Sequence, residues 1–317
     1  MRNNLGAAKR YEKNGADLSY CEIPNARPKL VLIHAQGVDA RNFDGVAGLL
    51  KRDFHVYSVD CYGHGGSSHD ASQYNIAAIG DAMIHWIADE IGGPVAIAGH
   101  SSGGLIAAYI AARSELCARL ILEDPPFFAS QGERRKHTFN YIDLSTICHE
   151  FLNQTAEADF PLYYFENQRA WRFFPEKSRE KIRAKLTGAA KKNRQKHPGG
   201  DLKVPFWPKA ALAGFQGMNQ YDPRFSEAFY DDSFHAGIPH EALLKDVRAQ
   251  TLFMKARTQT GDDGLLMAAL SEEDARRVVA TIPNCAAMRF DTGHGIHIEK
   301  PRAFAAAIRE FCAGMEN

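Results

Sequence analysis

The sequence predicts an α/β fold in which a mostly parallel sheet is covered by helices on both faces. Short apolar runs typical of strands alternate along the chain with stretches of helical pattern, which favours parallel strands joined by helices. Several of these runs are apolar without interruption, as in strands that are buried on both faces. The alternation stops between Leu122 and Thr251, which indicates a large insertion.

The expected strands begin with an N-terminal segment, Lys9–Cys21, which is predicted to supply one or two edge strands. Six further strands are expected from runs of apolar residues with the length of a typical strand. They are Leu30–Ile33, His55–Val59, Val95–Ala98, Arg119–Leu122, Thr251–Met254 and Ala287–Phe290.

Helical patterns lie between the expected strands, at Ile76–Ile91, Gly103–Arg113, Ser271–Ala280 and Pro301–Cys312. The last of these begins with a proline, which suits the first turn of a helix because its missing N–H would have no partner there. Strand, helix and strand thus follow one another as in a parallel sheet.

The inserted segment differs in kind from the rest of the chain. Residues 125–240 hold 20 of the 33 aromatic residues in 116 of the 317 positions. We expect a mainly helical cap domain at 125–244, set on a core domain made of 1–124 and 245–317. The aromatic residues, among them Trp171 and Trp207, either line a pocket for an apolar substrate or pack the cap's own core. The Lys- and Arg-rich stretch Glu176–Lys196 is either a solvated helix face or a patch for phosphate or acidic groups.

Composition excludes several classes of partner. The 38 basic residues balance the 38 acidic ones, so nothing in the net charge favours nucleic acid or an anionic membrane. The longest apolar run, Leu105–Ala112, is far shorter than the roughly 20 residues of a membrane span. The N-terminus lacks the apolar stretch of a signal peptide, and the six cysteines are widely spaced without a C-x-x-C pair. We expect a cytoplasmic protein with reduced cysteines.

The strongest motif is Gly99-His100-Ser101-Ser102-Gly103, which lies between an expected strand and an expected helix. A G-x-S-x-G sequence in this context predicts a sharp turn that exposes the serine hydroxyl as a nucleophile. The small flanking residues are needed because larger side chains would collide with the turn. The helix N-terminus that follows supplies free N–H groups for a developing oxyanion. Ser101 is therefore the candidate nucleophile.

A serine hydroxyl needs a base that accepts its proton. The candidate base lies in Asp291–His297, the loop between the last expected strand and the last helix, where His294 and His297 compete. We favour His294, which is closer to the end of the strand. The two histidines could also ligate a metal, but no third ligand has a suitable spacing, so no metal is predicted.

The oxyanion needs a second donor from another loop. His34-Ala35-Gln36-Gly37 follows the Leu30–Ile33 strand, and we expect the backbone N–H of Gln36 to act together with that of Ser102. The glycine-rich loop Asp60–Ser68 lacks the lysine and the glycine order of phosphate-binding loops, so it is interpreted as a structural turn.

These motifs together resemble those of the α/β-hydrolase superfamily. The chain carries HAQG, DCYGHGGSS, GHSSGG, an insertion of the length of a cap and DTGHGIHIEKP, in that order. The resemblance covers about residues 20–125 and 245–315. It implies an eight-stranded, mostly parallel sheet with a cap inserted after the sixth strand and no cofactor. It also implies Ser101 as nucleophile, His294 as base and Gln36 and Ser102 as oxyanion donors. Ser101 stands where epoxide hydrolases and dehalogenases have Asp, and Ala35 replaces the usual glycine of the oxyanion motif.

The acid that orients the histidine has more than one candidate. In most members of the superfamily it follows the strand before the histidine loop, which favours Asp263 over its neighbour Asp262 in the long segment after Thr251–Ala256. The alternative is Asp124, which comes one strand after the nucleophile. Asp124 could instead be a structural residue that bonds loop amides.

The function predicted from these residues is acyl transfer to water on a small substrate. The scissile bond is expected in an ester, thioester, lactone or activated ketone, and the aromatic cap favours an apolar or aromatic substrate. Two alternatives use the same fold: a small-molecule receptor with little turnover, and a cofactor-free oxygenase or peroxidase. The sequence does not distinguish a monomer from a homodimer.

Overall fold

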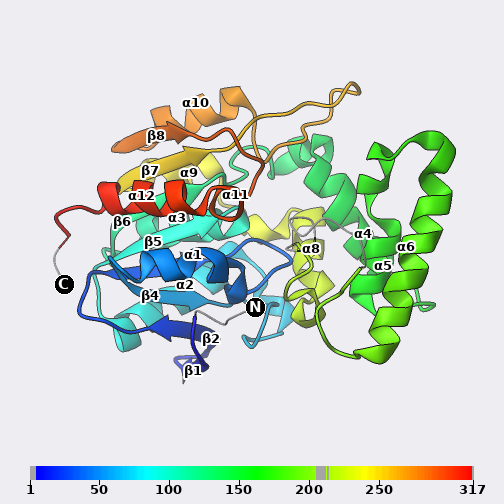
Figure 1. The fold of residues 1–317 in the computed structure, drawn as a ribbon. Helices are drawn as coiled ribbons and strands as arrows, with labels where there is room; N and C mark the ends of the chain where they lie inside the picture. The colour runs from blue at the N-terminus through cyan, green and yellow to red at the C-terminus, as the bar shows by residue number, and fades with distance from the viewer. Residues whose placement is uncertain (1–4, 205–211, 213, 316–317) are drawn as a thin grey trace.

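The computed structural model describes residues 5–204, 212 and 214–315 (Figure 1). Eight strands form one sheet in the order β1-β2-β4-β3-β5-β6-β7-β8. β2 pairs antiparallel with β1 and β4, and all other neighbours are parallel, which confirms the predicted sheet. The strands are β1 (Ala8–Lys13), β2 (Ala16–Ile23), β3 (Lys29–Ile33), β4 (His55–Val59), β5 (Val95–His100), β6 (Cys117–Glu123), β7 (Gln250–Lys255) and β8 (Cys285–Arg289).

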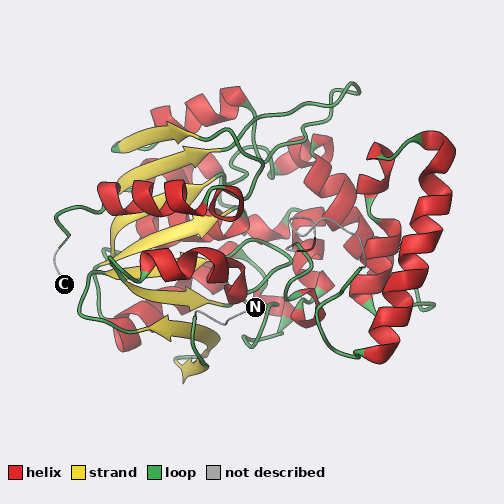
Figure 2. Ribbon diagram, viewed as in Figure 1, coloured by secondary structure: helices red, strands yellow, loops and turns green. Residues whose placement is uncertain are grey.

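The parallel strands alternate their side chains between two buried layers, as their uninterrupted apolar runs predict. On one face of β3, Val31 and Ile33 pack with the helices α2 (Ile76–Trp86) and α3 (Ser102–Arg113). On the other face, Leu30 and Leu32 pack with α1 (Asp44–Leu50) and α12 (Pro301–Phe311). The sheet is thus the middle layer of three (Figures 1 and 2).

The described residues form eleven α-helices, which are labelled in Figure 1. Those of the core are α1 (Asp44–Leu50), α2 (Ile76–Trp86), α3 (Ser102–Arg113), α9 (His240–Asp246), α10 (Glu272–Thr281), α11 (Ile296–Glu299) and α12 (Pro301–Phe311). Those of the insertion are α4 (Thr146–Leu152), α5 (Phe160–Asn167), α6 (Glu176–Lys196) and α8 (Pro223–Tyr230).

The predicted elements differ from the observed ones mainly at their ends. β5 continues to His100 because it pairs with β6 as far as Glu123. β8 starts at Cys285, before the predicted Ala287, and most of its side chains are exposed. An exposed edge strand gains its backbone bonds from its neighbour without an apolar pattern, so its ends are hard to read in the sequence.

The insertion between β6 and β7 forms the predicted helices, and the parallel strands point toward them (Figure 2). The predicted boundary at 244/245 falls within α9, which packs on α3. Trp171 is buried in the cap against Phe165 and Phe174, so it packs the cap's own core, while Trp207 lies outside the described residues. On α6 only Thr187 and Ala190 are buried.

In the loop after β4, the Asp60 carboxylate accepts hydrogen bonds from the N–H groups of Ala40 and Gly66, at 2.8 and 3.0 Å. This is the arrangement of a structural turn.

All six cysteines are free, although Cys21 and Cys285 are only half-buried. Within the described ranges, no helix has the length and apolar character to cross a membrane.

Candidate active site

Ser101 occupies a strained turn between β5 and α3. Its backbone has φ 55° and ψ −121°, a region that residues with a side chain rarely adopt. A Cβ atom on Gly99 would overlap the carbonyl oxygen of Gly103, and one on Gly103 would overlap that of Ile33. Both glycines of the motif are therefore required by close backbone approach, as the sequence predicts.

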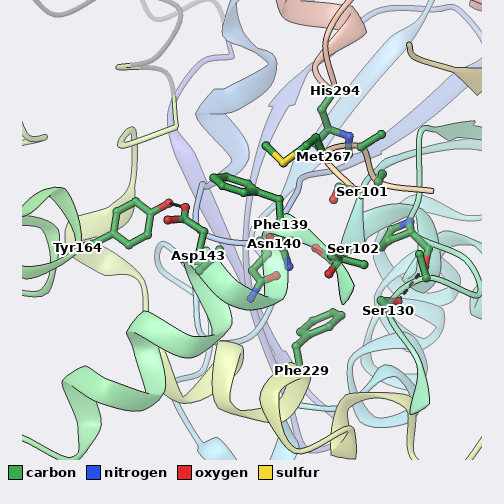
Figure 3. A pocket seen from close by; sticks show the side chains of 17 residues that line it. Ser101, Ser102, Ser130, Phe139, Asn140, Asp143, Tyr164, Phe229, Met267 and His294 are labelled. Atoms are coloured by element: carbon green, nitrogen blue, oxygen red, sulfur yellow. Dashed lines mark hydrogen bonds between the residues drawn. The ribbon is translucent and has the colours of Figure 1, made fainter. Parts of the chain in front are cut away.

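Ser101 and His294 line the same cavity, which has a volume of about 270 Å³ (Figure 3). His294 lies in the loop that links β8 to α11, and its side chain is 41% exposed. The ring of His100 lies against it, with 4.6 Å between the ring centroids, and the His100 Nε2 donates to the His294 carbonyl oxygen at 3.1 Å. The elbow and the histidine loop thus meet at the carboxyl edge of the sheet.

Asp124 is the carboxylate that contacts His294. The His294 Nδ1 donates to its Oδ2 at 2.8 Å, and the side chain of Asp124 is only 1% exposed. The other oxygen, Oδ1, accepts from the N–H of Ala256 at 3.1 Å and lies 3.4 Å from the Nζ of Lys255. The carboxylate is therefore fixed on both sides, with one oxygen directed at the imidazole.

The preference for Asp263 as the partner of His294 is wrong. Its Oδ2 accepts from the Arg172 guanidinium at 2.6 Å, and its side chain is 46% exposed. That contact also lowers the pKa of Asp263 from its ordinary value. The chain after β7 closes a turn of its own, in which the N–H of Gly261 donates to the Leu265 carbonyl. This turn carries Asp263, and the exposed Asp262 beside it, away from the histidine.

The two expected oxyanion donors also lie at the cavity. Gln36 follows β3 and Ser102 begins α3, and both line the cavity with Ser101. In the part of the chain that the structure describes, neither backbone N–H has an acceptor within hydrogen-bond distance. The Gln36 side chain donates to Ser226 of α8 at 2.5 Å, which fixes this loop against the cap. Two free N–H groups therefore lie at the cavity beside the serine.

His297, the competing histidine, is buried away from the cavity. Its Nδ1 donates to both oxygens of Glu123 at 2.9 Å, and its Nε2 donates to the Oδ1 of Asn42 at 3.0 Å. Burial raises the pKa of Glu123, but the adjacent His297 and His100 outweigh it, so the pKa lies below its ordinary value. Burial lowers the pKa of His100 to about 3. The two histidines of the loop thus have separate carboxylate partners.

One cluster among the described residues brings together side chains of the types that ligate metals. His100, Glu123 and His297 each offer an atom within 4.8 Å of the others. The cluster does not include His294, so the H-x-x-H pair considered in the sequence is not brought together as a ligand pair. Glu123 and His297 already bond each other, which is a sufficient structural account of their burial.

Several residues of the site were not singled out in the sequence. Lys255, at the end of β7, is 2% exposed and lies beside Asp124. Glu123 directly precedes Asp124 and could have been recognised as a second carboxylate at the same strand end. The cap contributes Phe139, Asp143 and Tyr164 to the cavity wall, and no local pattern indicates this.

The sequence of the chain matches a known protein family. Residues 30–307 match the sequence family described as the alpha/beta hydrolase family. The chain belongs to this family. The resemblance inferred from its motifs is therefore confirmed.

One relative of the chain is an esterase. The pimeloyl-acyl-carrier protein methyl ester esterase of Neisseria meningitidis serogroup C is 38% identical over 91 residues, which are 29% of this α/β-hydrolase and 34% of that protein. The match thus spans about a third of the relative's length.

Solved structures support the fold over the whole chain. A hydrolase from Pseudomonas aeruginosa PA01 has a TM-score of 0.62 at 18% identity and covers 98% of this chain and 100% of that one. The enol-lactonase from Burkholderia xenovorans LB400 has a TM-score of 0.60 at 16% identity and covers 96% and 99%, respectively. At these identities the likeness shows the fold alone.

Proposed function

We propose that the protein is a serine hydrolase that transfers the acyl group of a small ester, or a related acyl compound, to water. The observation that carries the proposal is the 2.8 Å contact between the Asp124 carboxylate and the His294 Nδ1, at a cavity that Ser101 also lines. A nucleophile, a base and an acid that orients the base are the parts that this chemistry requires. The esterase and lactonase among the similar proteins are consistent with it.

In the proposed mechanism, the Ser101 oxygen attacks the carbonyl carbon of the substrate while its proton passes to the His294 Nε2. Asp124 accepts the Nδ1–H bond, which fixes the tautomer of the imidazole and stabilises its charged form. The carbonyl oxygen becomes an oxyanion and accepts hydrogen bonds from the N–H groups of Gln36 and Ser102. The leaving group takes the proton from His294 as its bond to the carbonyl carbon breaks.

The acyl-enzyme that remains is opened by water through the same groups. His294 accepts a proton from the water as its oxygen attacks the acyl carbon, and then returns that proton to Ser101 as the acid product leaves. In both halves of the reaction, the negative charge of the oxyanion is stabilised by the N–H groups of Gln36 and Ser102. No metal or cofactor takes part in the proposed mechanism.

The proposal is tested with p-nitrophenyl esters of increasing chain length. We expect Ser101→Ala to lower kcat by at least about 10³-fold, because the nucleophile is lost. The matched control is Ser130→Ala, since Ser130 lines the same cavity but its hydroxyl donates to the Pro126 carbonyl. A fluorophosphonate should add covalently to Ser101 of the wild type. Equal activity of the Ser101→Ala variant and the wild type would contradict the proposal, and a protein that binds esters without turnover would favour a receptor.

A further inference from the structure

A buried carboxylate lies in the cavity wall on the side away from the serine. Asp143 is 5% exposed and lines the cavity, although it belongs to the cap turn Tyr141–Ser145 before α4. Figure 3 shows Asp143 and Tyr164 on one side, and Ser101 with His294 on the other, with Phe139 between them. The cavity therefore has an acidic group remote from the proposed site of acyl transfer.

The hydrogen bonds of Asp143 come from uncharged donors. The Tyr164 hydroxyl donates to its Oδ2 at 2.5 Å, and the backbone N–H of Arg169 donates to its Oδ1. The Arg169 guanidinium itself pairs with Glu150 at 2.8 Å. Across the ranges that the structure describes, no Lys, Arg or His side chain forms an ion pair with Asp143. The Arg169 charge acts on Asp143 only from beyond ion-pair distance. A buried carboxylate without an ion-pair contact is unusual, because buried charges are normally paired.

The walls between the two ends of the cavity are largely apolar. Phe139, Leu144, Phe229 and Met267 contribute side chains to them. Asp143 is the single carboxylate among the 17 described residues that line the cavity, and those residues include no Lys or Arg. Burial also raises the pKa of Asp143, and a bound cation would favour its ionised form. An anionic group at this end would be repelled by the Asp143 carboxylate, and no Lys or Arg among the described lining residues would pair with it.

We propose that Asp143 is the subsite for a protonated amine, and that the substrate carries this amine at the far end of an apolar spacer from the scissile bond. The inference rests on the proposed function and names the substrate class for it. The ammonium would donate to the Asp143 carboxylate, while the spacer lies against Phe139 and Met267. Charge-assisted hydrogen bonds of this kind are about twice as strong as neutral ones, and they are strongest where water is excluded.

The test compares three p-nitrophenyl esters of equal chain length, which end in an ammonium, a methyl or a carboxylate group. For the wild type, kcat/KM should be at least about tenfold higher for the ammonium ester than for the methyl ester. The carboxylate ester should be the poorest of the three. Asp143→Asn keeps the shape of the side chain but removes its charge and replaces one of its two acceptor oxygens by a donor NH2 group. The ratio of ammonium to methyl ester should therefore fall to about one.

Two controls separate a binding role from a structural one. Glu166→Gln removes a carboxylate charge on α5, outside the cavity, where Glu166 pairs with Lys191, and it should leave the ratio as in the wild type. Tyr164→Phe keeps the carboxylate and should retain the preference for the ammonium ester. If Asp143→Asn lowers the melting temperature and keeps the wild-type ratio, Asp143 only ties the cap together and the inference is wrong. A wild type with no preference for the ammonium ester also overturns it.

A binding measurement distinguishes failure of the proposed hydrolase function from failure of the amine subsite. If no ester is hydrolysed, Ser101→Ala protein is titrated with hexylamine and with hexanol by calorimetry. Tighter binding of hexylamine, lost in Asp143→Asn, supports the amine subsite even without turnover. Equal binding of the two compounds refutes it.

Discussion

Two histidine–carboxylate pairs lie next to each other in this molecule, and they differ in what surrounds them. Asp124 contacts His294, and Glu123, the preceding residue, contacts His297, with nearly equal distances of 2.8 and 2.9 Å. His294 is 41% exposed at the cavity, whereas the side chains of His297 and Glu123 are each 1% exposed. The same residue types at adjacent positions thus form one accessible pair and one buried pair.

The second ring nitrogen of each histidine explains the difference. The Nε2 of His297 donates to the Oδ1 of Asn42, so both of its nitrogens are engaged within the core. Among the described residues, His294 has a ring hydrogen bond only at its Nδ1, to the Asp124 carboxylate. Its Nε2 is therefore accessible for proton exchange with a reacting group. A histidine next to a carboxylate is therefore a candidate base only where its other nitrogen is accessible.

The largest effect is expected from the accessible pair. Asp124→Asn should lower kcat by about 10⁴-fold, because the amide cannot stabilise the charged imidazole and can hold the wrong tautomer. The change also leaves the buried Lys255 amine without its carboxylate, so the melting temperature should fall. Rates measured on folded protein with p-nitrophenyl butyrate separate the two effects. A rate within about tenfold of the wild type would show that Asp124 is not the acid.

The buried pair should affect stability instead. His297→Leu leaves Glu123 as a buried carboxylate without its partner, and the free energy of unfolding should decrease by about 3–5 kcal/mol. Urea unfolding measures this decrease, and the rate per folded molecule should stay near that of the wild type. The double variant Glu123→Gln with His297→Leu removes the stranded charge and should recover part of the stability. If His297→Leu abolishes the reaction in a stably folded protein, the comparison of the two pairs fails.

His100 lies between the two pairs, with its ring 4.6 Å from that of His294 and 5.0 Å from that of His297. Its pKa in the folded protein is lowered by burial from 6.5 to about 3. Between these values the unfolded chain binds one more proton than the folded protein, so stability should decrease as the pH falls below 6.5.

A histidine that binds a proton in the unfolded chain but not in the folded protein changes the free energy of unfolding by up to about 1.4 kcal/mol per pH unit. His100→Gln should reduce the slope of unfolding free energy against pH by that amount, measured by urea unfolding between about pH 7 and pH 5. The control is His69→Gln, the same change at an exposed position. The same slope in His100→Gln and wild type would mean that the ring is not held neutral.

The smallest effect is expected at Asp263. Its exposed contact with Arg172 lies away from both pairs, and exposed ion pairs contribute little to stability. Asp263→Asn should therefore keep kcat/KM within about twofold of the wild type and leave the melting curve unchanged. A large loss of rate in this variant, measured beside Asp124→Asn, would restore Asp263 as the acid.

The sequence allowed Ser101 and His294, the proposed nucleophile and base, to be singled out because their signals are local. A strand, a tight turn and a helix are consecutive in the chain, and Gly99 and Gly103 are required within that turn by backbone contacts. The loop of His294 is likewise bounded by a strand and a helix that have recognisable patterns. Such features depend on neighbours in sequence, so one sequence is enough to indicate them.

The carboxylate partner of His294 could not be assigned in the same way. Asp124 and Asp263 both follow a parallel strand, and a strand end alone does not fix where a side chain points. The outcome depends on the turn closed between Gly261 and Leu265, and on Arg172, which lies in the cap far away in sequence. The positions of Lys255 and Asp143 have the same origin, since each depends on packing between distant segments.

The sequence by itself therefore determined the α/β sheet, the elbow at Ser101 and the loop that carries His294. The sheet follows from the spacing of apolar residues along the chain, and the elbow and the loop follow from the backbone geometry of short segments. Only the tertiary structure decided that Asp124 and not Asp263 contacts His294, that His297 is buried on Glu123, and which cap side chains reach the cavity. The two histidine–carboxylate contacts join residues that are 170 and 174 positions apart. Whether such side chains meet, and which cap side chains reach the cavity, is fixed by how the layers pack, which no local pattern encodes.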